Sequence, residues 1–299
     1  MAKLSVSVVI PSWNSESQLK QNLPYVFKAA ERVKAEIVIV DDASSFDQSA
    51  AYLQSLGDKI RFYSNHTNGG FSYTVNRGVK LAQGDVIMLL NTDVRPSPDC
   101  FVNALSHFSD PTVFAVTFNS GEAWAGAKWY GGLLQHAKVD PIPTNAQELN
   151  PSLWASGGQA AFDRRKWLSL GGMDLLYKPF YWEDVDLGYR AWRRGWRIIW
   201  DPVSRCVHDH QKSVIASNFS PEFVKATAQR NQFLFVWKNI FDRRMLTSHF
   251  LHLPLFIKNY PKPFFRALML LPQALRERTV EKHALVKTDR EIIAPWQNH

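Results

Sequence analysis

Three groups of acidic residues in this 299-residue chain follow predicted strands or open a predicted helix. They are Asp41 with Asp42, Asp93, and Glu183 with Asp184 and Asp186. In parallel α/β sheets ligands bind beyond the carboxyl ends of the strands, where carboxylates can hold a metal ion or take a proton. Each group alone also suits an ordinary turn or helix N-terminus. Three such groups at the ligand-facing ends of one sheet predict a reactive site.

A divalent cation is the first chemistry that these residues could support. Mg²⁺ and Mn²⁺ prefer oxygen ligands and often take one or two carboxylates together with substrate phosphates. Asp93 follows an apolar strand and offers such a carboxylate, and His208 could complete a mixed oxygen and nitrogen set that suits Mn²⁺. A lone histidine more often has a structural role, so both interpretations of His208 stay open at this point.

Two common nucleotide-binding loops are absent from the sequence. The first predicted strand leads into Ser12-Trp13-Asn14 rather than a G-x-G-x-x-G turn, which excludes a typical Rossmann dehydrogenase. No G-x-x-x-x-G-K-[ST] motif occurs, which excludes P-loop chemistry. The phosphates of any bound nucleotide would therefore need a metal ion.

The elements that would position these residues alternate between strands and helices. Apolar runs predict strands over 6–10, 37–40, 60–63, 86–90, 113–118 and 197–200, and helical spacing predicts helices over 19–33, 71–82, 98–108, 164–170, 183–191 and 221–239. Strand, helix and strand within about 40 residues form a βαβ unit, which implies a parallel sheet. Residues 120–152 lack clear periodicity and are expected to be irregular or a hairpin. The fold class is therefore α/β.

Composition and charge narrow the class of protein. Hydrophobic residues make up 45% of the chain, enough for one large α/β domain or a domain with a smaller appendage. Cys100 and Cys206 are too few for a disulfide framework, no apolar run reaches the ~18 residues of a membrane span, and no secretory signal is recognised. We therefore expect a cytoplasmic protein or one on the cytoplasmic face of the inner membrane. The formal charge of +8 fits an anionic partner, but no motif supports nucleic-acid binding.

The motifs and their order resemble the family 2 glycosyltransferases, and most closely a bacterial rhamnosyltransferase-like branch with the GT-A fold. The matching segments are 8–14, 40–44, 68–72 with Asn76 and Gly78, 90–94, 171–174, 183–187, 202–208, Arg230-Asn231 with Lys238-Asn239, and 288–291. Each segment is a weak signal alone, but their number, order and spacing over nearly the whole chain are specific. The resemblance implies a GT-A fold with a mostly parallel, Rossmann-like sheet flanked by helices.

The resemblance also implies roles on the donor side of the site. The residues that would bind the nucleotide sugar are Pro11, Trp13, Asp42, Asn68, Asn76, Asn91 and Lys212. Asn91-Thr92-Asp93 occupies the position of the family's D-x-D motif, where Asp93 and His208 would hold Mn²⁺ or Mg²⁺. Asn91 stands where that motif has its first acidic residue, which should weaken metal binding in the absence of nucleotide.

The acceptor side follows from the same resemblance. Asp184 matches the family's catalytic base, which would take the proton of the attacking hydroxyl. Because the metal would stabilise the leaving nucleotide diphosphate, one base suffices and in-line attack predicts inversion at the anomeric carbon. The residues expected to contact the acceptor or the sugar are Trp154, Gly158, Trp182 and Glu183.

These implications define the expected function. The chain would move one sugar from a dTDP-, UDP- or GDP-linked donor to a carbohydrate or lipid-linked acceptor, in bacterial cell-surface polysaccharide or glycolipid assembly. Rhamnose is the first expectation for the sugar. The main alternative is a catalytically inactive relative that binds a nucleotide or a membrane. A processive synthase is disfavoured because no Q-x-x-R-W motif occurs, and a nucleotidyltransferase because the first strand has no glycine-rich, basic loop after it.

The expected domain organisation divides the chain near residue 240. Residues 1–240 would form the catalytic domain, with a nucleotide-binding half over 1–118 and an acceptor half over 150–215, and 241–299 a helical extension. The extension combines apolar blocks over 250–257 and 264–271 with basic residues such as Lys258, Lys262 and Arg276. Such a segment can lie on a membrane surface, pack on the catalytic domain or form a homo-oligomer, and the sequence leaves all three open.

Overall fold

A computed structural model describes residues 4–121, 124–137, 148–209 and 218–297, and its centre is a mixed β-sheet. The strand order is β3-β2-β1-β4-β10-β6-β11-β5, and the short β9 pairs with β11. The strands are β1 (Val6–Ser12), β2 (Glu36–Asp41), β3 (Arg61–Ser64), β4 (Val86–Leu90), β5 (Val94–Pro96), β6 (Val113–Asn119), β9 (Asn150–Pro151), β10 (Gln159–Asp163) and β11 (Arg197–His208). A separate hairpin joins β7 (Gly126–Tyr130) to β8 (Leu133–Ala137).

The first half of the sheet confirms the predicted βαβ pattern. Strands β3, β2, β1 and β4 run parallel, and nearly all side chains of β1, β2 and β4 are buried because helices cover both faces of the sheet. Val9 and Leu89 point to one hydrophobic cluster, whereas Val8 and Leu90 point to the other. This alternation follows from the two-residue period of a strand.

The second half of the sheet combines the parallel pair of β6 and β11 with antiparallel strands. Strand β10 runs antiparallel to both β4 and β6, and β5 runs antiparallel to β11. Strand β11 is also longer than the predicted 197–200, because it continues beyond Pro202 through a register shift between Asp201 and Arg205 and then pairs with β5. The extension brings His208, at the end of β11, to the edge of the sheet.

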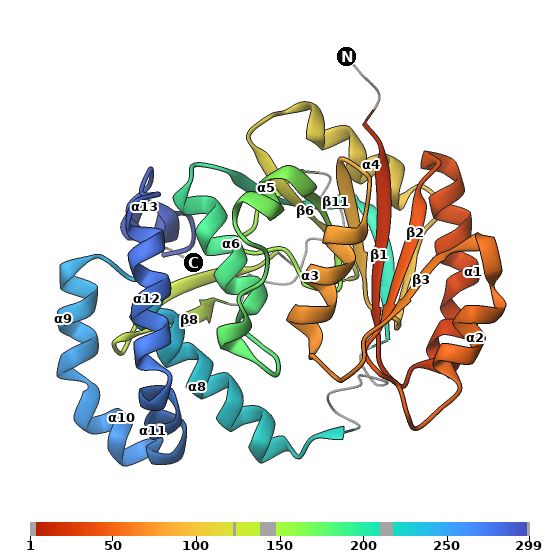
Figure 1. Cartoon of the computed structure of the whole chain (residues 1–299). Coiled ribbons are helices and arrows are strands. Elements are labelled where there is room, and N and C mark those ends of the chain that lie inside the picture. Colours follow the sequence, from red (N-terminus) through yellow and green to blue (C-terminus); the bar gives the residue numbers. More distant parts are fainter. Residues whose placement is uncertain (1–3, 122–123, 138–147, 210–217, 298–299) are drawn as a thin grey trace.

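Helices cover the two faces unequally. Residues of α1, α2 and α4 belong to the cluster on one face, and residues of α3, α5, α6 and α8 to the larger cluster on the other. Their bounds are α1 (Glu16–Val33), α2 (Ser49–Ser55), α3 (Phe71–Leu81), α4 (Cys100–Ser106), α5 (Arg164–Ser169), α6 (Glu183–Arg193) and α8 (Pro221–Asn239). In Figure 1 the red and orange first part of the chain lies on the right, and the green α5 and α6 lie between it and the blue C-terminal helices.

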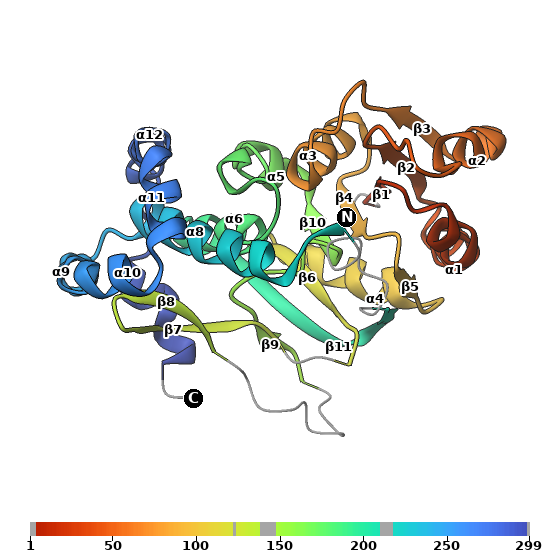
Figure 2. The same ribbon diagram turned by 90° about the horizontal axis from the view of Figure 1, so that it is seen from below.

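The chain after residue 240 is helical, as predicted, and it shares the core of the rest of the chain. Its helices are α9 (Arg243–Leu251), α10 (Leu253–Asn259), α11 (Pro261–Met269), α12 (Leu271–Lys282) and α13 (Asp289–Ile293), and Figure 2 shows α10 and α11 beside α8. Phe264 packs against Phe233 and Trp237 of α8, with ring centroids 5.5 and 6.0 Å apart. Asp289 forms a buried ion pair with Arg193 of α6, at 2.8 Å. The domain boundary near 240 stays a prediction, since these contacts join both sides of it.

Within the described ranges, no helix is both long enough and apolar enough to span a bilayer.

Candidate active site

A cavity of about 560 Å³ opens beyond the carboxyl ends of β1, β2 and β4, beside the first turn of α6. Its volume lies in the range of about 300–1,000 Å³ that is usual for small-molecule sites. The lining residues are Pro11, Ser12, Trp13, Ser15, Asp42, Asn68, Gly70, Phe71, Asn91, Thr92, Asp93, Ser156, Gly157, Gly158, Pro179, Phe180, Tyr181, Glu183, Asp184, His208 and Phe219. Parallel strands bring these distant segments to one edge of the sheet.

Most of the residues singled out by the sequence meet in this cavity. They are Pro11, Trp13, Asp42, Asn68, Asn91, Asp93, Gly158, Glu183, Asp184 and His208. Lys212 lies outside the described residues. Asn76, Trp154 and Trp182 are not among the lining residues.

The three residues outside the cavity are held by other contacts. The side-chain amide of Asn76 donates to the backbone oxygen of Met173 at 2.7 Å and accepts from its nitrogen at 2.9 Å. Trp154 and Trp182 both pack on His136, with ring centroids 4.9 and 5.2 Å apart. These three side chains therefore make contacts away from the lining of the cavity, and the roles expected of them toward a ligand stay predictions.

Asp42 fixes the loop that follows β3 to the end of β2. Its Oδ1 accepts from the backbone N–H of Gly69 and its Oδ2 from that of Gly70, both at 2.8 Å, and Asn65 Nδ2 donates to Oδ1 at 2.6 Å. These contacts place Asn68 and Gly70 in the cavity wall. The neighbouring Asp41 bonds within its own turn and does not line the cavity.

Asp93 and His208 meet because β5 pairs with β11. The register sets His208 opposite Val94, the residue after Asp93, and brings His208 Nε2 to 3.2 Å from Asp93 Oδ1. Both side chains are about one-tenth exposed, at 10% for Asp93 and 11% for His208. Asn22 of α1 donates to the backbone oxygen of Thr92 at 2.7 Å and so holds the turn in place.

Asn91 is positioned by Gly158 from the opposite strand. The backbone N–H of Asn91 donates to the carbonyl of Gly158 at 2.8 Å. A Cβ atom at Gly158 would lie 2.2 Å from Asn91 Nδ2, so only glycine leaves space for this amide. Gly158, which the sequence predicts to contact the acceptor, therefore also leaves room for the Asn91 side chain.

The residues of this corner fit a divalent cation with few protein ligands. Asp93 Oδ1 is buried and accepts no hydrogen bond from any described residue, and the Nε2 of His208 faces it. Across the described ranges no three His, Cys, Asp or Glu side chains converge on one point. An ion held by Asp93 and His208 would therefore take its remaining ligands from phosphate oxygens and water, a common arrangement for Mg²⁺.

Glu183 and Asp184 open α6 at the cavity wall, and burial dominates the electrostatics of both. Burial raises the pKa of Asp184 to about 6, although the backbone N–H groups of Val185 and Gly157 donate to its carboxylate. Burial and the neighbouring Asp184 raise the pKa of Glu183 well above its usual value. In the described structure neither carboxylate has a cationic partner, so a proton is held more readily here than on an ordinary carboxylate.

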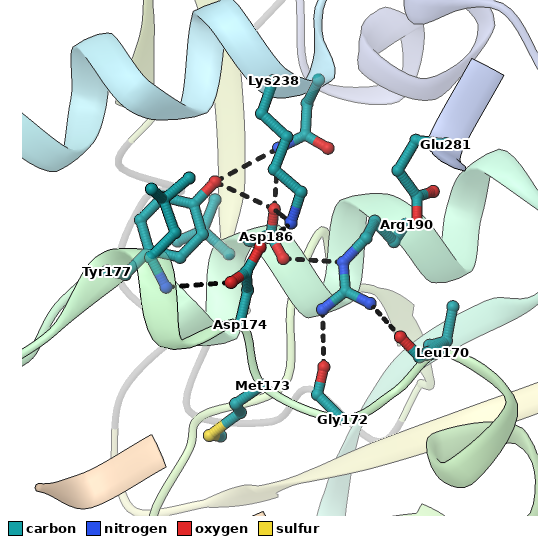
Figure 3. Close-up of polar contacts among 12 residues, drawn as sticks. Leu170, Gly172, Met173, Asp174, Tyr177, Asp186, Arg190, Lys238 and Glu281 are labelled. Carbon is teal, nitrogen blue, oxygen red and sulfur yellow. Dashed lines mark hydrogen bonds and ion pairs between the residues drawn. The ribbon is translucent and has the colours of Figure 1, made fainter. Parts of the chain in front are cut away.

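Asp186, two residues further along α6, has the opposite environment (Figure 3). Its carboxylate accepts from Arg190 Nε at 2.6 Å, Lys238 Nζ at 2.8 Å, Tyr177 OH at 2.9 Å and Asn239 Nδ2 at 2.8 Å. The two cations and these hydrogen bonds outweigh burial and hold the pKa of Asp186 far below its usual value. Asp186 is therefore a structural anion.

The same network connects α6 to α8 and to the loop after α5 (Figure 3). Lys238 also pairs with Asp174 at 2.6 Å, so two carboxylates face two cations in the interior. The Arg190 guanidinium donates to the carbonyls of Leu170 and Gly172, at 2.7 and 2.6 Å. The start of α6 is thus anchored on the side away from the cavity.

The turn before α6 has a strained backbone, and a side chain of α8 holds it by hydrogen bonds. Tyr181 and Trp182 have φ values of 69° and 78°, which side chains rarely adopt. Asn231 Nδ2 donates to the carbonyls of Tyr177, Phe180 and Tyr181 at 2.8–3.0 Å. The left-handed turn directs Trp182 into the core and leaves Tyr181, 41% exposed, at the cavity.

Four aromatic residues of the cavity wall were not predicted as site residues. They are Phe71, Phe180, Tyr181 and Phe219. Tyr181 stands beside the acidic motif in the sequence, and an aromatic residue there suits a sugar ring. The choice of Trp182 over Tyr181 depends on a backbone turn that periodicity does not reveal.

Comparisons with known proteins give a family and a fold. The model of the family described as Glycosyl transferase family 2 matches residues 7–169, more than half of the chain. Human polypeptide N-acetylgalactosaminyltransferase 10 is 26% identical over 235 residues, which is 70% of this chain and 38% of that protein. A pre-mycofactocin glycosyltransferase of Mycobacterium tuberculosis is 27% identical over 212 residues, 69% of this chain and 43% of that protein. The chain thus spans about two fifths of the length of these relatives.

Two solved structures share the fold. A crystal structure of GalNAc-T7 with UDP, GalNAc and Mn²⁺ has a TM-score of 0.74 at 18% identity and covers 99% of this chain and 57% of that chain. A mannosyltransferase from Pyrobaculum calidifontis, in complex with GDP-Man and Mn²⁺, has a TM-score of 0.56 at 19% identity, with 95% of this chain and 75% of that chain covered. The GT-A fold, with a mixed sheet between helices and a helical C-terminal region, is confirmed. The chain belongs to glycosyl transferase family 2.

Proposed function

We propose that this chain is an inverting, metal-dependent glycosyltransferase that moves a single sugar from a nucleotide diphosphate sugar to an acceptor hydroxyl. The observation that carries the proposal is one cavity with two unlike corners. Asp93 and His208 form a corner that fits a cation, and Asp184 forms a corner with a carboxylate whose pKa is raised to about 6. Membership of glycosyl transferase family 2 supports the same reaction.

The donor would bind along the ends of β1, β2 and β4. Pro11, Trp13 and Asn68 line that part of the cavity and would surround the base and the ribose, with Asp42 holding the Asn68 loop in position. The diphosphate would lie near Asn91 and Asp93. A divalent ion bound there would act as a Lewis acid that stabilises the leaving nucleotide diphosphate.

Asp184 would act as the general base. A sugar hydroxyl is a weak nucleophile, and a carboxylate within hydrogen-bond reach can take its proton during attack on the anomeric carbon. Near neutral pH most Asp184 carboxylates are ionised at a pKa of about 6, yet remain more basic than an exposed aspartate. With one base and no second nucleophile in the proposed reaction, attack in line with the leaving group gives inversion. Glu183, whose pKa is raised well above its usual value by burial and by the neighbouring Asp184, would orient the acceptor.

The finer assignment of substrates is also a proposal. The solved relatives are complexes with UDP and with GDP-Man, which supports our proposal of a dTDP-, UDP- or GDP-linked donor. Rhamnose remains our first candidate for the sugar, on the resemblance to the rhamnosyltransferase-like branch. A carbohydrate or lipid-linked acceptor in bacterial cell-surface polysaccharide or glycolipid assembly is the corresponding biological role.

Thermal stability with nucleotides tests the donor site. The protein is melted with UDP, dTDP, GDP, CDP or ADP, each with Mn²⁺, Mg²⁺ or EDTA. A ligand at a hundredfold excess over its Kd stabilises the folded state by about 2.7 kcal/mol. We expect one nucleotide to stabilise the protein only when metal is present. The absence of a shift with every nucleotide, in protein shown to be folded, would contradict the proposal.

Turnover separates the enzyme from an inactive relative. The nucleotide identified by melting is supplied with a small panel of sugars, and release of nucleotide diphosphate is followed with candidate acceptors. The enzyme is expected to release it in an acceptor-dependent manner. Binding of nucleotide without any release would favour the inactive relative.

A further inference from the structure

The C-terminal helices carry an apolar surface that the rest of the chain leaves uncovered. Its residues, which we call the α10–α11 patch, are Leu251, Leu255, Ile257, Phe265, Leu268 and Met269. They are 42–75% exposed, with Leu251 and Met269 at 75% and 74%. Singly exposed apolar residues are ordinary, but several large ones within one stretch of about 20 residues indicate a contact surface.

Helix α11 has two apolar faces, one buried against the rest of the chain and one that belongs to the patch. Phe264 and Ala267 are buried against α8, as an amphipathic helix requires. Phe265, Leu268 and Met269 lie at i, i+3 and i+4 on a different face, where a surface helix normally has polar residues. Packing within the chain accounts for the first face only.

The charged residues within the stretch that contains the patch are all basic. From Arg243 to Arg276 the sequence contains no aspartate or glutamate. The basic residues in that stretch are Arg243, Arg244, Lys258, Lys262, Arg266 and Arg276, and all six are exposed. Apart from Arg276, which lies 3.8 Å from Glu277, none of these side chains forms an ion pair with a described residue. The surface therefore combines unneutralised positive charge with exposed apolar area.

The two kinds of residue alternate along the same helices. Lys262 and Arg266 are one turn apart on α11 and flank Phe265 in the sequence. On α9, Arg243 and Arg244 share a hollow of about 370 Å³ with Thr247, Ser248 and His252, and Leu251 borders it. Two guanidinium groups beside an exposed leucine suit a phosphate group that is attached to an acyl chain.

We propose that the α10–α11 patch docks this protein on a bilayer that contains anionic phospholipids. An anionic bilayer surface offers negative headgroups for the basic residues and an acyl boundary for the apolar ones. A second copy of the chain would bring equal positive charges together, and a nucleic acid would leave the apolar residues without a partner. Helices α10 and α11 have 7 and 9 residues, so they lie in the interface rather than cross it.

The proposed docking would orient the cavity. Helix α8 packs against α11 and α12, and Asn231 of α8 holds the turn that precedes Asp184. In Figure 1 the end of β1 that borders the cavity faces downward, on the same side as α10 and α11. If the proposed transferase function holds, an acceptor embedded in the membrane would meet the cavity. The docking itself does not depend on that function.

Vesicle co-sedimentation of the full chain tests the proposal without any substrate. Phosphatidylcholine vesicles with and without phosphatidylglycerol are compared, at low and high salt. We expect binding to the anionic vesicles alone, weakened by salt, because the attraction between basic residues and an anionic surface is screened by ions. Absence of binding to anionic vesicles at low salt would overturn the proposal.

Two variants and one control distinguish the contribution of the patch to vesicle binding from that of the overall charge. K262E/R266E and F265S/M269S should each reduce binding about tenfold or more, with unchanged melting temperature since all four positions are exposed. K28E/K59E makes the same charge change at exposed positions on α1 and shortly after α2, and Figure 1 shows these two helices on the opposite side of the molecule from α10 and α11. This control should bind almost as wild type does. Equal losses in the patch variants and this control would overturn the proposal. A concentration-dependent dimer that only the patch variants abolish, without lipid binding, would assign the surface to a second copy instead.

Discussion

Asp184 and Asp186 lie two residues apart in the first turn of α6, yet their surroundings shift their pKa values in opposite directions. Asp186 faces the interior and is surrounded by Arg190, Lys238, Tyr177 and Asn239. Asp184 faces the cavity and receives only backbone N–H groups. Both are buried, but the pKa of Asp186 lies far below its usual value whereas that of Asp184 rises to about 6.

The difference shows that burial alone does not decide the role of a carboxylate. A buried carboxylate with two cationic partners stays ionised and fixes the elements around it. A buried carboxylate without such partners gains affinity for a proton, which is a property of general bases. One helical turn therefore combines a rigid support with a reactive group, and the support keeps the reactive group in position.

Removal of the reactive carboxylate should have the largest effect. We expect Asp184→Asn to lower kcat about 10²- to 10⁴-fold, the usual contribution of a general base, with nucleotide affinity unchanged. Initial rates and nucleotide titrations measure both quantities. The exposed Asp58→Asn serves as control and should retain full activity. Turnover that survives in Asp184→Asn would exclude it as the base.

Removal of the structural carboxylate should act on stability. Asp186→Asn removes the negative charge that pairs with the buried cations of Arg190 and Lys238. The free energy of unfolding should therefore fall by about 3–5 kcal/mol. Because the folded pKa of Asp186 is depressed, its stabilisation is present above about pH 4 and is lost as the pH falls, so the difference from wild type shrinks in acid. Urea unfolding at several pH values measures it.

The exposed pair of Arg197 and Asp110, at 3.1 Å, provides the matched control for that variant. Asp110→Asn should change the unfolding free energy by less than about 1 kcal/mol, since exposed ion pairs contribute little. Similar losses of unfolding free energy in Asp110→Asn and Asp186→Asn would show that the buried network stabilises the fold no more than an exposed ion pair does.

The reactive carboxylate should in turn reduce the stability of the fold. The folded pKa of Asp184 lies above its usual value, so wild type loses stability as the pH rises from about 4 to about 6. Asp184→Asn escapes that loss and should be more stable by about 1–3 kcal/mol above pH 6, with little difference near pH 4. Thermal or urea unfolding of the two proteins across this range tests the sign. A variant less stable than wild type at neutral pH would contradict our description of the site.

Loss of the side chain that supports the strained turn should have the smallest effect. Asn231→Ala leaves three backbone carbonyls without their donor and should lower kcat about tenfold, with nucleotide affinity retained. The exposed Lys225→Ala on the same helix is the control. Equal loss of nucleotide binding and kcat in Asn231→Ala would indicate general damage rather than a displaced Asp184.

The strand-helix alternation and the acidic motifs allowed much of the fold and site to be predicted. β1, β2 and β4, and the residues that follow them, come from local apolar runs whose parallel pairing fixes where their ends meet. The antiparallel insertion of β10 depends on the path of the chain after β6, and local patterns do not record that path. The extension of β11 to His208 was missed for a similar reason, because Pro202 normally ends such a pattern.

The differences between the predicted and the observed lining of the cavity arise from backbone geometry and local contacts. Trp182 and Tyr181 are adjacent aromatic residues, and only the left-handed turn decides that Tyr181 reaches the cavity. The amide of Asn76 was matched to a ligand role, but its contacts with Met173 occupy it. The roles assigned to the residues that do line the cavity stay predictions until they are tested.

The pH dependence of kcat/KM for sugar transfer, at saturating metal and at two temperatures, tests the central claim most directly. We predict a rise of about tenfold per pH unit up to an apparent pKa near 6, the value that burial gives Asp184, and a plateau above it. The midpoint should hardly move with temperature, as is usual for a carboxyl group. A flat profile between about pH 5 and pH 8 in folded protein, or a midpoint that shifts with temperature as an imidazole does, would contradict the assignment of Asp184 as the base.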